Sequence, residues 1–123
     1  MGALSNSEFV AFVAEQMAFI DGLRMCAMFG GQGVYRDDDI FAIIVDDSLY
    51  FKTDKVSRAE FEARGLAPFC YQARGKLVAM QYFQAPPEVF EETESMRYWA
   101  QLACAAALRA KKTHAGTPPS RPR

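Results

Sequence analysis

The chain has 123 residues, of which 50% are hydrophobic and 24% are charged, so its composition is that of a single globular domain. Its net charge of −1 excludes a generally basic nucleic-acid binder, and its one histidine excludes mechanisms and metal sites that need two. No apolar run approaches the roughly 18 residues that a membrane-spanning helix needs.

The first element in chain order is a helix, expected over residues 7–21. Ser5 and Glu8 have the spacing of a capping box, and apolar residues then recur at helical intervals. Gly22 follows directly and suits the left-handed position beyond a helix end.

Four short apolar segments then predict an antiparallel β-meander, because turn residues separate them at regular intervals. The expected strands cover residues 24–29, 34–36, 40–45 and 48–52. The third strand is apolar on both faces, which favours a central position in the sheet. The expected turns are the glycine-rich segment 30–33 and the aspartates at 37–39 and 46–47.

The second half of the chain predicts a short helix, two strands and a long helix. Ser57 is a suitable N-cap for a helix ending at Arg64, and strands are expected over residues 68–72 and 77–83. Pro86 and Pro87 open a helix expected over residues 88–110, with acids at its start and bases at its end. One face of this helix is apolar and carries Val89, Met96, Trp99, Ala103 and Ala106.

These elements predict an α+β fold, in which N- and C-terminal helices pack on one face of an antiparallel meander sheet of five to six strands. The folded domain is expected over residues 1–112. Residues 113–123 hold three prolines and no large apolar side chain, and so predict a disordered tail. Charge divides similarly, since residues 1–108 carry 9 basic and 15 acidic residues, whereas five basic residues and no acid follow.

The residues that could bind a ligand or a metal are better explained by structural roles. The segment Gly30–Gly33 lacks both the dinucleotide fingerprint and the P-loop lysine, which favours a turn over a phosphate cradle. The acids Asp37, Asp38 and Asp39 lack the spacing of a calcium loop, and His114 lies in the expected tail.

The cysteines and aromatic residues are also better explained by structural roles. Cys26, Cys70 and Cys104 form no CxxC pair and are expected to be reduced, small hydrophobic residues of a cytoplasmic protein. Trp99 and its neighbours Phe90, Met96 and Tyr98 are expected in the core. Tyr35, Tyr50 and Phe51 could stack on bases, but the acidic balance of the domain argues against nucleic acid. We therefore predict no catalytic residue, no cofactor and no metal.

Two segments resemble the N-terminal domain of the TfoX/Sxy family. Residues 24–35 read Arg-Met-Cys-Ala-Met-Phe-Gly-Gly-Gln-Gly-Val-Tyr, and residues 47–54 read Asp-Ser-Leu-Tyr-Phe-Lys-Thr-Asp. The likeness continues through Ile-Phe-Ala-Ile at residues 40–43 and Met-Gln-Tyr-Phe at residues 80–83, and it extends over about residues 9–111. The family-motif residues are Arg24, Met28, Phe29, Gly30, Gly31, Gly33, Tyr35, Leu49, Tyr50, Lys52, Thr53, Asp54, Tyr98 and Trp99.

The resemblance implies a fold like that of the secretion chaperones and no enzymatic activity. Full-length family members regulate competence genes as transcriptional coactivators and carry a second, C-terminal domain. This chain is expected to be a stand-alone N-terminal domain. Gln32 stands where the family commonly has an aromatic residue or histidine.

Two functions of different classes follow. The first is a regulatory protein-interaction domain with a protein partner, such as a transcription factor or a polymerase-associated regulator. It is expected to form a weak homodimer, without specific DNA binding or membrane attachment. The second is a small-ligand-binding or catalytic domain. A pocket with converging polar groups and acids of shifted pKa would favour the ligand-binding or catalytic domain. An exposed apolar patch or sheet edge would favour the protein-interaction domain.

Overall fold

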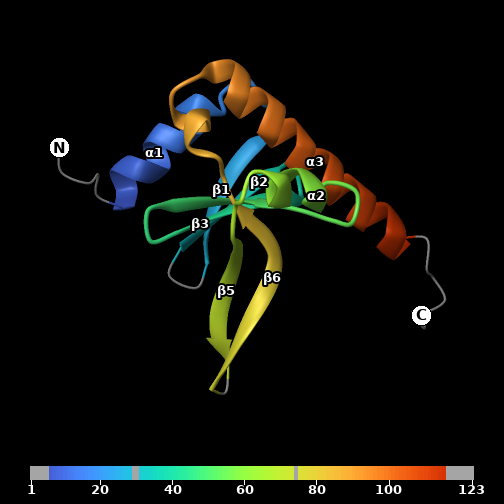
Figure 1. Cartoon of the computed structure of the whole chain (residues 1–123). Coiled ribbons are helices and arrows are strands. Elements are labelled where there is room, and N and C mark those ends of the chain that lie inside the picture. The colour runs from blue at the N-terminus through green and yellow to red at the C-terminus, as the bar shows by residue number, and fades with distance from the viewer. Residues whose placement is uncertain (1–5, 29–30, 74, 116–123) are drawn as a thin grey trace.

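The structure is a computed structural model that describes residues 6–28, 31–73 and 75–115 (Figure 1). In chain order, its elements are α1 (Asn6–Gln16), β1 (Leu23–Met28), β2 (Gly31–Arg36), β3 (Asp39–Val45), β4 (Ser48–Lys52), α2 (Arg58–Ala63), β5 (Pro68–Ala73), β6 (Lys76–Gln84), the 3₁₀ helix η1 (Pro87–Phe90) and α3 (Thr93–Ala115).

The six strands form one antiparallel sheet in the order β1-β2-β3-β4-β6-β5. The connection through α2 carries the chain past β4, so that β6 pairs with β4 and β5 becomes an edge strand. The predicted fold class is confirmed.

The helices cover one face of the sheet, and the hydrophobic core lies between the sheet and the helices (Figure 1). From the sheet, Phe41, Ile44 and Phe51 are at most 1% exposed. The predicted apolar face of the last helix is confirmed, because Met96, Trp99 and Ala103 are all buried. Small alanines on this face let the helix backbone lie close to the sheet.

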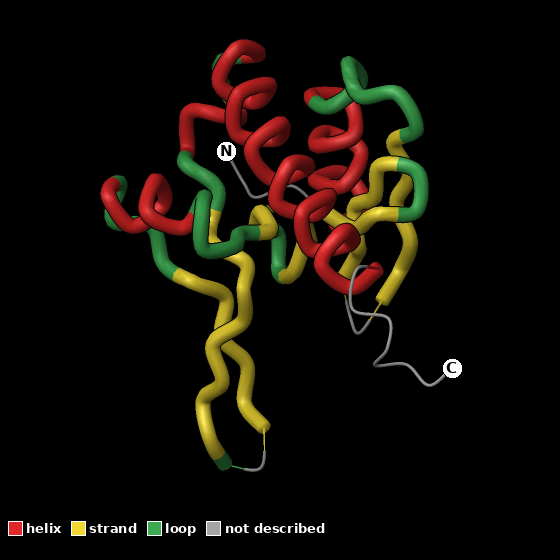
Figure 2. The backbone as a smooth tube through the Cα atoms, turned by 90° about the vertical axis from the view of Figure 1, so that its right-hand side faces the viewer, coloured by secondary structure: helices red, strands yellow, loops and turns green. Residues whose placement is uncertain are grey.

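The β5–β6 hairpin projects from the sheet, away from the helices (Figure 2). Only the last three residues of β6, from Tyr82 to Gln84, pair with β4. The earlier residues of β6 pair with β5 alone, from Cys70↔Ala79 to Ala73↔Lys76. We call residues 68–81 the projecting hairpin.

The first helix is shorter than its apolar spacing predicts, and it ends at Gln16 rather than at residue 21. The chain then continues in four-residue turns, in which the Ala18 amide donates to the Glu15 carbonyl and the Ile20 amide to the Met17 carbonyl. Gly22 has the predicted left-handed conformation, with φ of 81°, and its carbonyl accepts a hydrogen bond from the Asp37 amide. Ser5 of the expected capping box lies outside the described residues.

The glycine-rich segment is not the turn that its composition predicts. Gly31 and Gly33 lie within β2, and Gly30 is outside the described residues. A Cβ atom at Gly31 would lie 2.2 Å from the carbonyl oxygen of Ile44 on the neighbouring strand. Glycine is therefore required here for close approach of two backbones. The aspartate turns are confirmed, with φ of 58° at Asp37 and 59° at Asp47.

The predicted long helix is interrupted at its start. Pro87–Phe90 forms the separate 3₁₀ helix, and the α-helix begins only at Thr93. The amides of Glu91 and Glu92 both donate to the Glu88 carbonyl, which closes the first turn before the chain changes direction. At the other end, α3 continues to Ala115, three residues beyond the expected domain boundary, and residues 116–123 lie outside the described part.

Candidate functional site

The family-motif residues divide between the two faces of the sheet. Residues directly opposite each other in an antiparallel pair project from the same face. Arg24 is opposite Tyr35, Met28 is opposite Gly31, and Lys52 is opposite Tyr82. These residues occupy the face that the helices leave uncovered, which we call the open face. The motif residues described on it are Arg24, Met28, Gly31, Gly33, Tyr35, Tyr50 and Lys52.

Other motif residues have structural roles. Leu49, Thr53 and Trp99 are at most 5% exposed, and Trp99 packs edge-on against Phe61. The prediction that Tyr98 lies in the core is wrong, because its side chain is exposed. Its hydroxyl hydrogen-bonds with the Glu60 carboxylate, which raises the pKa of the tyrosine. Phe29 and Gly30 lie outside the described residues.

Asp54 connects the end of β4 to the last helix. Its carboxylate accepts hydrogen bonds from Arg109 Nε at 2.6 Å and Nη2 at 3.0 Å, and from the Ser57 amide at 3.0 Å. The Arg109 hydrogen bond is the main reason that the pKa of Asp54 falls to about 2. The carboxylate is committed to this contact between chain segments and does not face the open face.

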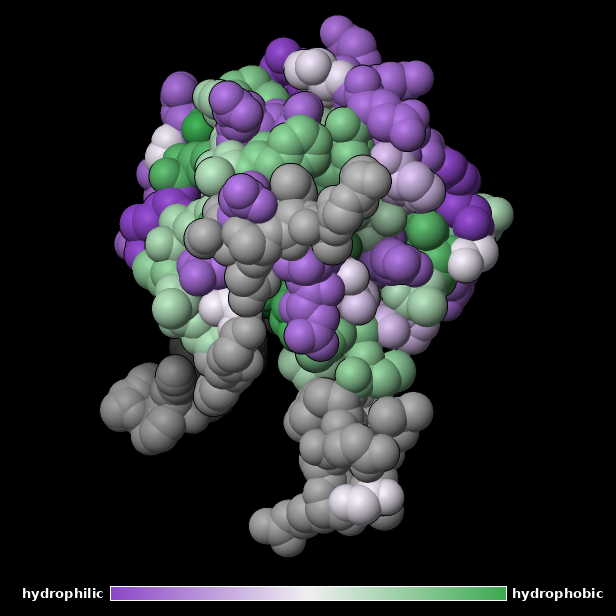
Figure 3. Space-filling model, turned by 90° about the vertical axis from the view of Figure 1, so that its left-hand side faces the viewer, coloured by the Kyte–Doolittle hydropathy of each residue, from purple (hydrophilic) through white to green (hydrophobic). Residues whose placement is uncertain are grey.

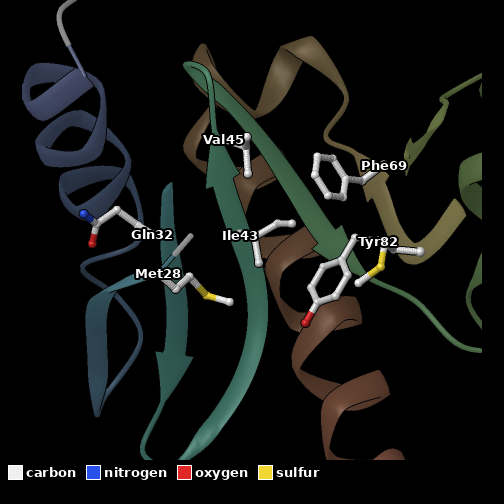
Figure 4. Close-up of a pocket in the computed structure, with 7 residues that line it drawn as sticks. Met28, Gln32, Ile43, Val45, Phe69 and Tyr82 are labelled. Atoms are coloured by element: carbon white, nitrogen blue, oxygen red, sulfur yellow. The ribbon is translucent and has the colours of Figure 1, made fainter. Parts of the chain in front are cut away.

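An apolar groove of about 500 Å³ lies on the open face, between the meander and the projecting hairpin (Figure 4). In Figure 4, Met28 reaches in from one side and Phe69 and Tyr82 from the other, with Ile43 between them. Figure 3 shows apolar residues at the base of the projecting hairpin. The lining residues are Met28, Gln32, Ile43, Val45, Phe69, Met80 and Tyr82.

Gly33 lies beside this groove and leaves room for the side chains around it. A Cβ atom there would lie 2.8 Å from Met28 Sδ, 3.0 Å from Tyr35 Cε1 and 3.1 Å from Ile40 Cδ1. The missing side chain thus lets Met28, Tyr35 and Ile40 converge over the β2 backbone. The motif glycines position the groove wall, and no anion cradle is needed to explain them.

Two aromatic–cation pairs border the groove. The Lys52 ammonium lies 5.4 Å from the centre of the Tyr82 ring, and the Arg24 guanidinium lies 4.7 Å from that of Tyr35. Burial raises the pKa of Tyr82, and the nearby Tyr35 raises it further, so the Tyr82 hydroxyl keeps its proton at neutral pH.

Sequence reasoning named only Met28 among the groove-lining residues as a candidate. Ile43 and Val45 had one usable signal, since a strand that is apolar on both faces leaves apolar side chains on the uncovered face. Met80 and Tyr82 belong to residues 80–83, which carry part of the family resemblance, but the sequence did not assign them to a groove. Phe69 gave no signal, because the sequence does not show that the hairpin folds beside β3.

The acids and the cysteines are not brought together. Asp38 Oδ1 lies 3.8 Å from Arg24 on β1, and Asp39 Oδ1 lies 3.4 Å from Lys111 on α3. The two neighbouring carboxylates therefore face different cations. Within residues 6–28, 31–73 and 75–115 there is no cluster of three metal-ligating side chains, and no helix is long and apolar enough to cross a bilayer.

The three cysteines are free, as expected. Cys104 is buried, which raises the pKa of its thiol, but Cys70 is exposed rather than packed as the sequence suggested. Cys70 lies on β5, in the projecting hairpin, where few neighbours can cover it.

The model of the TfoX N-terminal domain matches residues 15–107, which include every groove-lining residue. The chain belongs to the TfoX N-terminal domain family. Among characterised proteins, the DNA transformation protein TfoX1 of Aliivibrio fischeri is 30% identical over 66 residues. This match covers 54% of the chain but only 31% of that relative's length. The chain therefore corresponds to about a third of this TfoX protein.

Proposed function

We propose that this TfoX-type domain is a non-enzymatic regulatory module that docks a protein partner along its open face. The observation that carries the proposal is an exposed apolar groove beside an unpaired strand edge. An apolar surface of this kind marks interaction sites, and an open strand edge can accept an extended segment.

The open edge belongs to the projecting hairpin. On the side of β6 away from β5, the β4 ladder reaches only as far as Tyr82, and the Thr53 amide then donates to the Gln81 carbonyl. Beyond Gln81, the described strands provide no further ladder partner on that side. Met80 is 37% exposed at this edge and also lines the groove. A partner strand added here would place its side chains against the groove.

The name of the matched relative supports one class of partner. The matched relative is named as a DNA transformation protein. We propose that the partner is a transcription factor or a polymerase-associated regulator, and that the domain meets it in the cytoplasm.

The distribution of shifted acids supports binding rather than catalysis. The carboxyl groups whose pKa is lowered are Asp54, paired with Arg109, and Glu88, paired with Arg64. Neither lines the groove. Tyr82 does line the groove with a shifted pKa, but the shift is upward, so its hydroxyl keeps its proton and is not tuned to act as a base or nucleophile.

Affinity capture with the full chain tests the proposal. Met80→Asp places a charge at the groove, and Val56→Asp places the same charge at a site that is 69% exposed in the loop before α2. In nuclease-treated cytosol of the source organism, wild type and Val56→Asp should retain the same regulatory protein, and Met80→Asp should lose it. Equal retention by all three proteins would contradict docking along the open face.

A further inference from the structure

Two polar groups beside the groove lack a hydrogen-bond or ion-pair partner within the described part of the chain. The Tyr82 side chain is only 8% exposed and lines the groove, but its hydroxyl makes no hydrogen bond there. Buried hydroxyl groups are nearly always hydrogen-bonded, so this one needs an explanation. The Lys52 ammonium lies over the same ring and faces no carboxylate among the described residues.

Other cations of the domain are differently placed. Arg64 lies 2.7 Å from Glu88, and Arg109 lies 2.6 Å from Asp54. Lys52 belongs to the motif whose other described members have explanations within the fold. Leu49 and Thr53 are buried, Tyr50 packs edge-on against Phe69, and Asp54 holds Arg109. Lys52 packs its ammonium over the Tyr82 ring, but this charge has no counter-ion among the described residues.

We propose that the groove binds a small amphiphilic carboxylate, whose apolar chain lies between Met28, Ile43 and Phe69 and whose carboxylate accepts hydrogen bonds from Tyr82 and Lys52. The groove volume of about 500 Å³ falls within the range of about 300–1,000 Å³ that small-molecule sites occupy. The walls supply apolar contact along the chain, and the Lys52 ammonium lies 5.4 Å from the centre of the Tyr82 ring that lines the groove.

The chemistry of this end selects the head group. A phenol that keeps its proton and an ammonium both donate, so an acceptor with negative charge satisfies both. A cationic head group would meet the Lys52 charge. A neutral alcohol would satisfy Tyr82 but leave the ammonium without a counter-ion. This inference goes beyond the protein-interaction proposal and is tested without any protein partner.

Calorimetric titration of the full chain with sodium decanoate tests the site. Decanol and decyltrimethylammonium, which carry the same chain length on a different head group, are the comparison ligands. Decanoate should bind at least about tenfold more tightly than decyltrimethylammonium. Octanoate should bind about tenfold more weakly than decanoate, because two methylene groups fewer are buried.

The variants locate the head group. Lys52→Met keeps the aliphatic stem and should weaken decanoate binding about tenfold while leaving decanol unchanged. Tyr82→Phe removes only the hydroxyl and should weaken decanoate about fivefold. Lys55→Met removes an exposed cation three residues away and is the matched control. Circular dichroism verifies that each variant is folded.

Three results would overturn the inference. These are no decanoate binding, equal affinity for the anionic and cationic amphiphiles, or a Lys52→Met variant that binds decanoate as wild type does. If Tyr82→Phe fails to fold, the Lys52 and Lys55 pair decides the question alone.

Discussion

Asp54 shows how a single motif residue can be explained by the fold. It lies just after β4, and its two carboxylate oxygens meet Arg109, 55 positions further along the chain. The same carboxylate accepts the Ser57 amide, while the Ser57 hydroxyl accepts the Asp54 amide at 3.1 Å. Asp54 thus fixes the entry to α2 and joins it to the C-terminal half of α3.

Replacing Asp54 with asparagine should destabilise the domain in a pH-dependent way. The folded pKa of about 2 lies below the ordinary value of 3.8, so the ionised form stabilises the fold above about pH 4, and this contribution is lost as the pH falls toward 2. Arg109 is 39% exposed, so we expect a loss of about 1 kcal/mol at pH 7 after allowing for solvent screening.

Thermal or urea unfolding of wild type and Asp54→Asn at pH 7 and at pH 2 measures this difference. The two proteins should differ at pH 7 and converge at pH 2. A difference that stays constant across this pH range would mean that the side chain acts through packing rather than through its charge.

The two described motif glycines should differ in their tolerance of a methyl group. At Gly31 the added Cβ meets a backbone oxygen at 2.2 Å, which can move only with the strand. At Gly33 the nearest atom is Met28 Sδ at 2.8 Å, at the flexible part of a side chain. Gly31→Ala should therefore cost about 3 kcal/mol of stability and Gly33→Ala about 1 kcal/mol.

Chemical denaturation of both variants gives this order directly, and Gly75→Ala provides a reference in which the left-handed backbone, with φ of 80°, is strained but no atom lies within 4 Å. Equal losses at Gly31 and Gly33 would contradict the close-approach explanation. The sequence showed that these positions need glycine but not why. A turn and a tight strand contact demand the same residue, and only the neighbouring strand distinguishes them.

At the scale of elements, patterns with a local cause were predictable and those with a distant cause were not. Strand β4 was predicted with its observed bounds, because turn residues delimit it on both sides. Helix α1 ends early because the chain after Met17 turns back so that Gly22 can bond to Asp37. The groove depends on the crossing of β6 to β4, which no local spacing reveals.

The projecting hairpin should be the least stable strand pair of the sheet. An isolated two-stranded ribbon is marginal in water, and the outer part of β6 pairs with β5 alone. Strand β3 pairs on both sides and lies over the core. In hydrogen exchange, amides of Cys70 and Ala79 should exchange at least about a hundredfold faster than those of Ala42 and Ile44. Equal protection in a monomeric sample would show that something else stabilises the hairpin.

For the whole molecule, the open edges predict self-association. Strands β1 and β5 are edge strands, and the exposed Met80 lies beside the unpaired part of β6. We expect a weak homodimer in fast exchange with the monomer. Light scattering over a concentration series should show a mass that rises above 13.7 kDa, and Met80→Asp should lower it. A constant mass of 13.7 kDa at millimolar concentration would exclude the dimer.

The whole-molecule charge predicts that the domain does not read DNA by itself. Duplex affinity comes largely from phosphates neutralised by lysine and arginine. Residues 1–108 carry 9 basic and 15 acidic residues. Five cations of the described residues also pair with acids. The ion pairs are Arg24–Asp38, Arg58–Glu62, Arg64–Glu88, Arg109–Asp54 and Lys111–Asp39. A phosphate approaching any of these five cations would have to displace a carboxylate.

We therefore expect only non-specific binding, with Kd on the order of 10⁻⁴ M at physiological salt. The measurement is fluorescence anisotropy with labelled duplexes of different sequence, over a salt series, on the full chain and on a form ending at Ala115. The few remaining phosphate contacts should give a shallow salt slope, and removal of the last two arginines, Arg121 and Arg123, should reduce it further. Sub-micromolar, sequence-dependent binding by the shortened form would mean that a folded surface reads DNA despite its acids. A TfoX-type role would then need no protein intermediary.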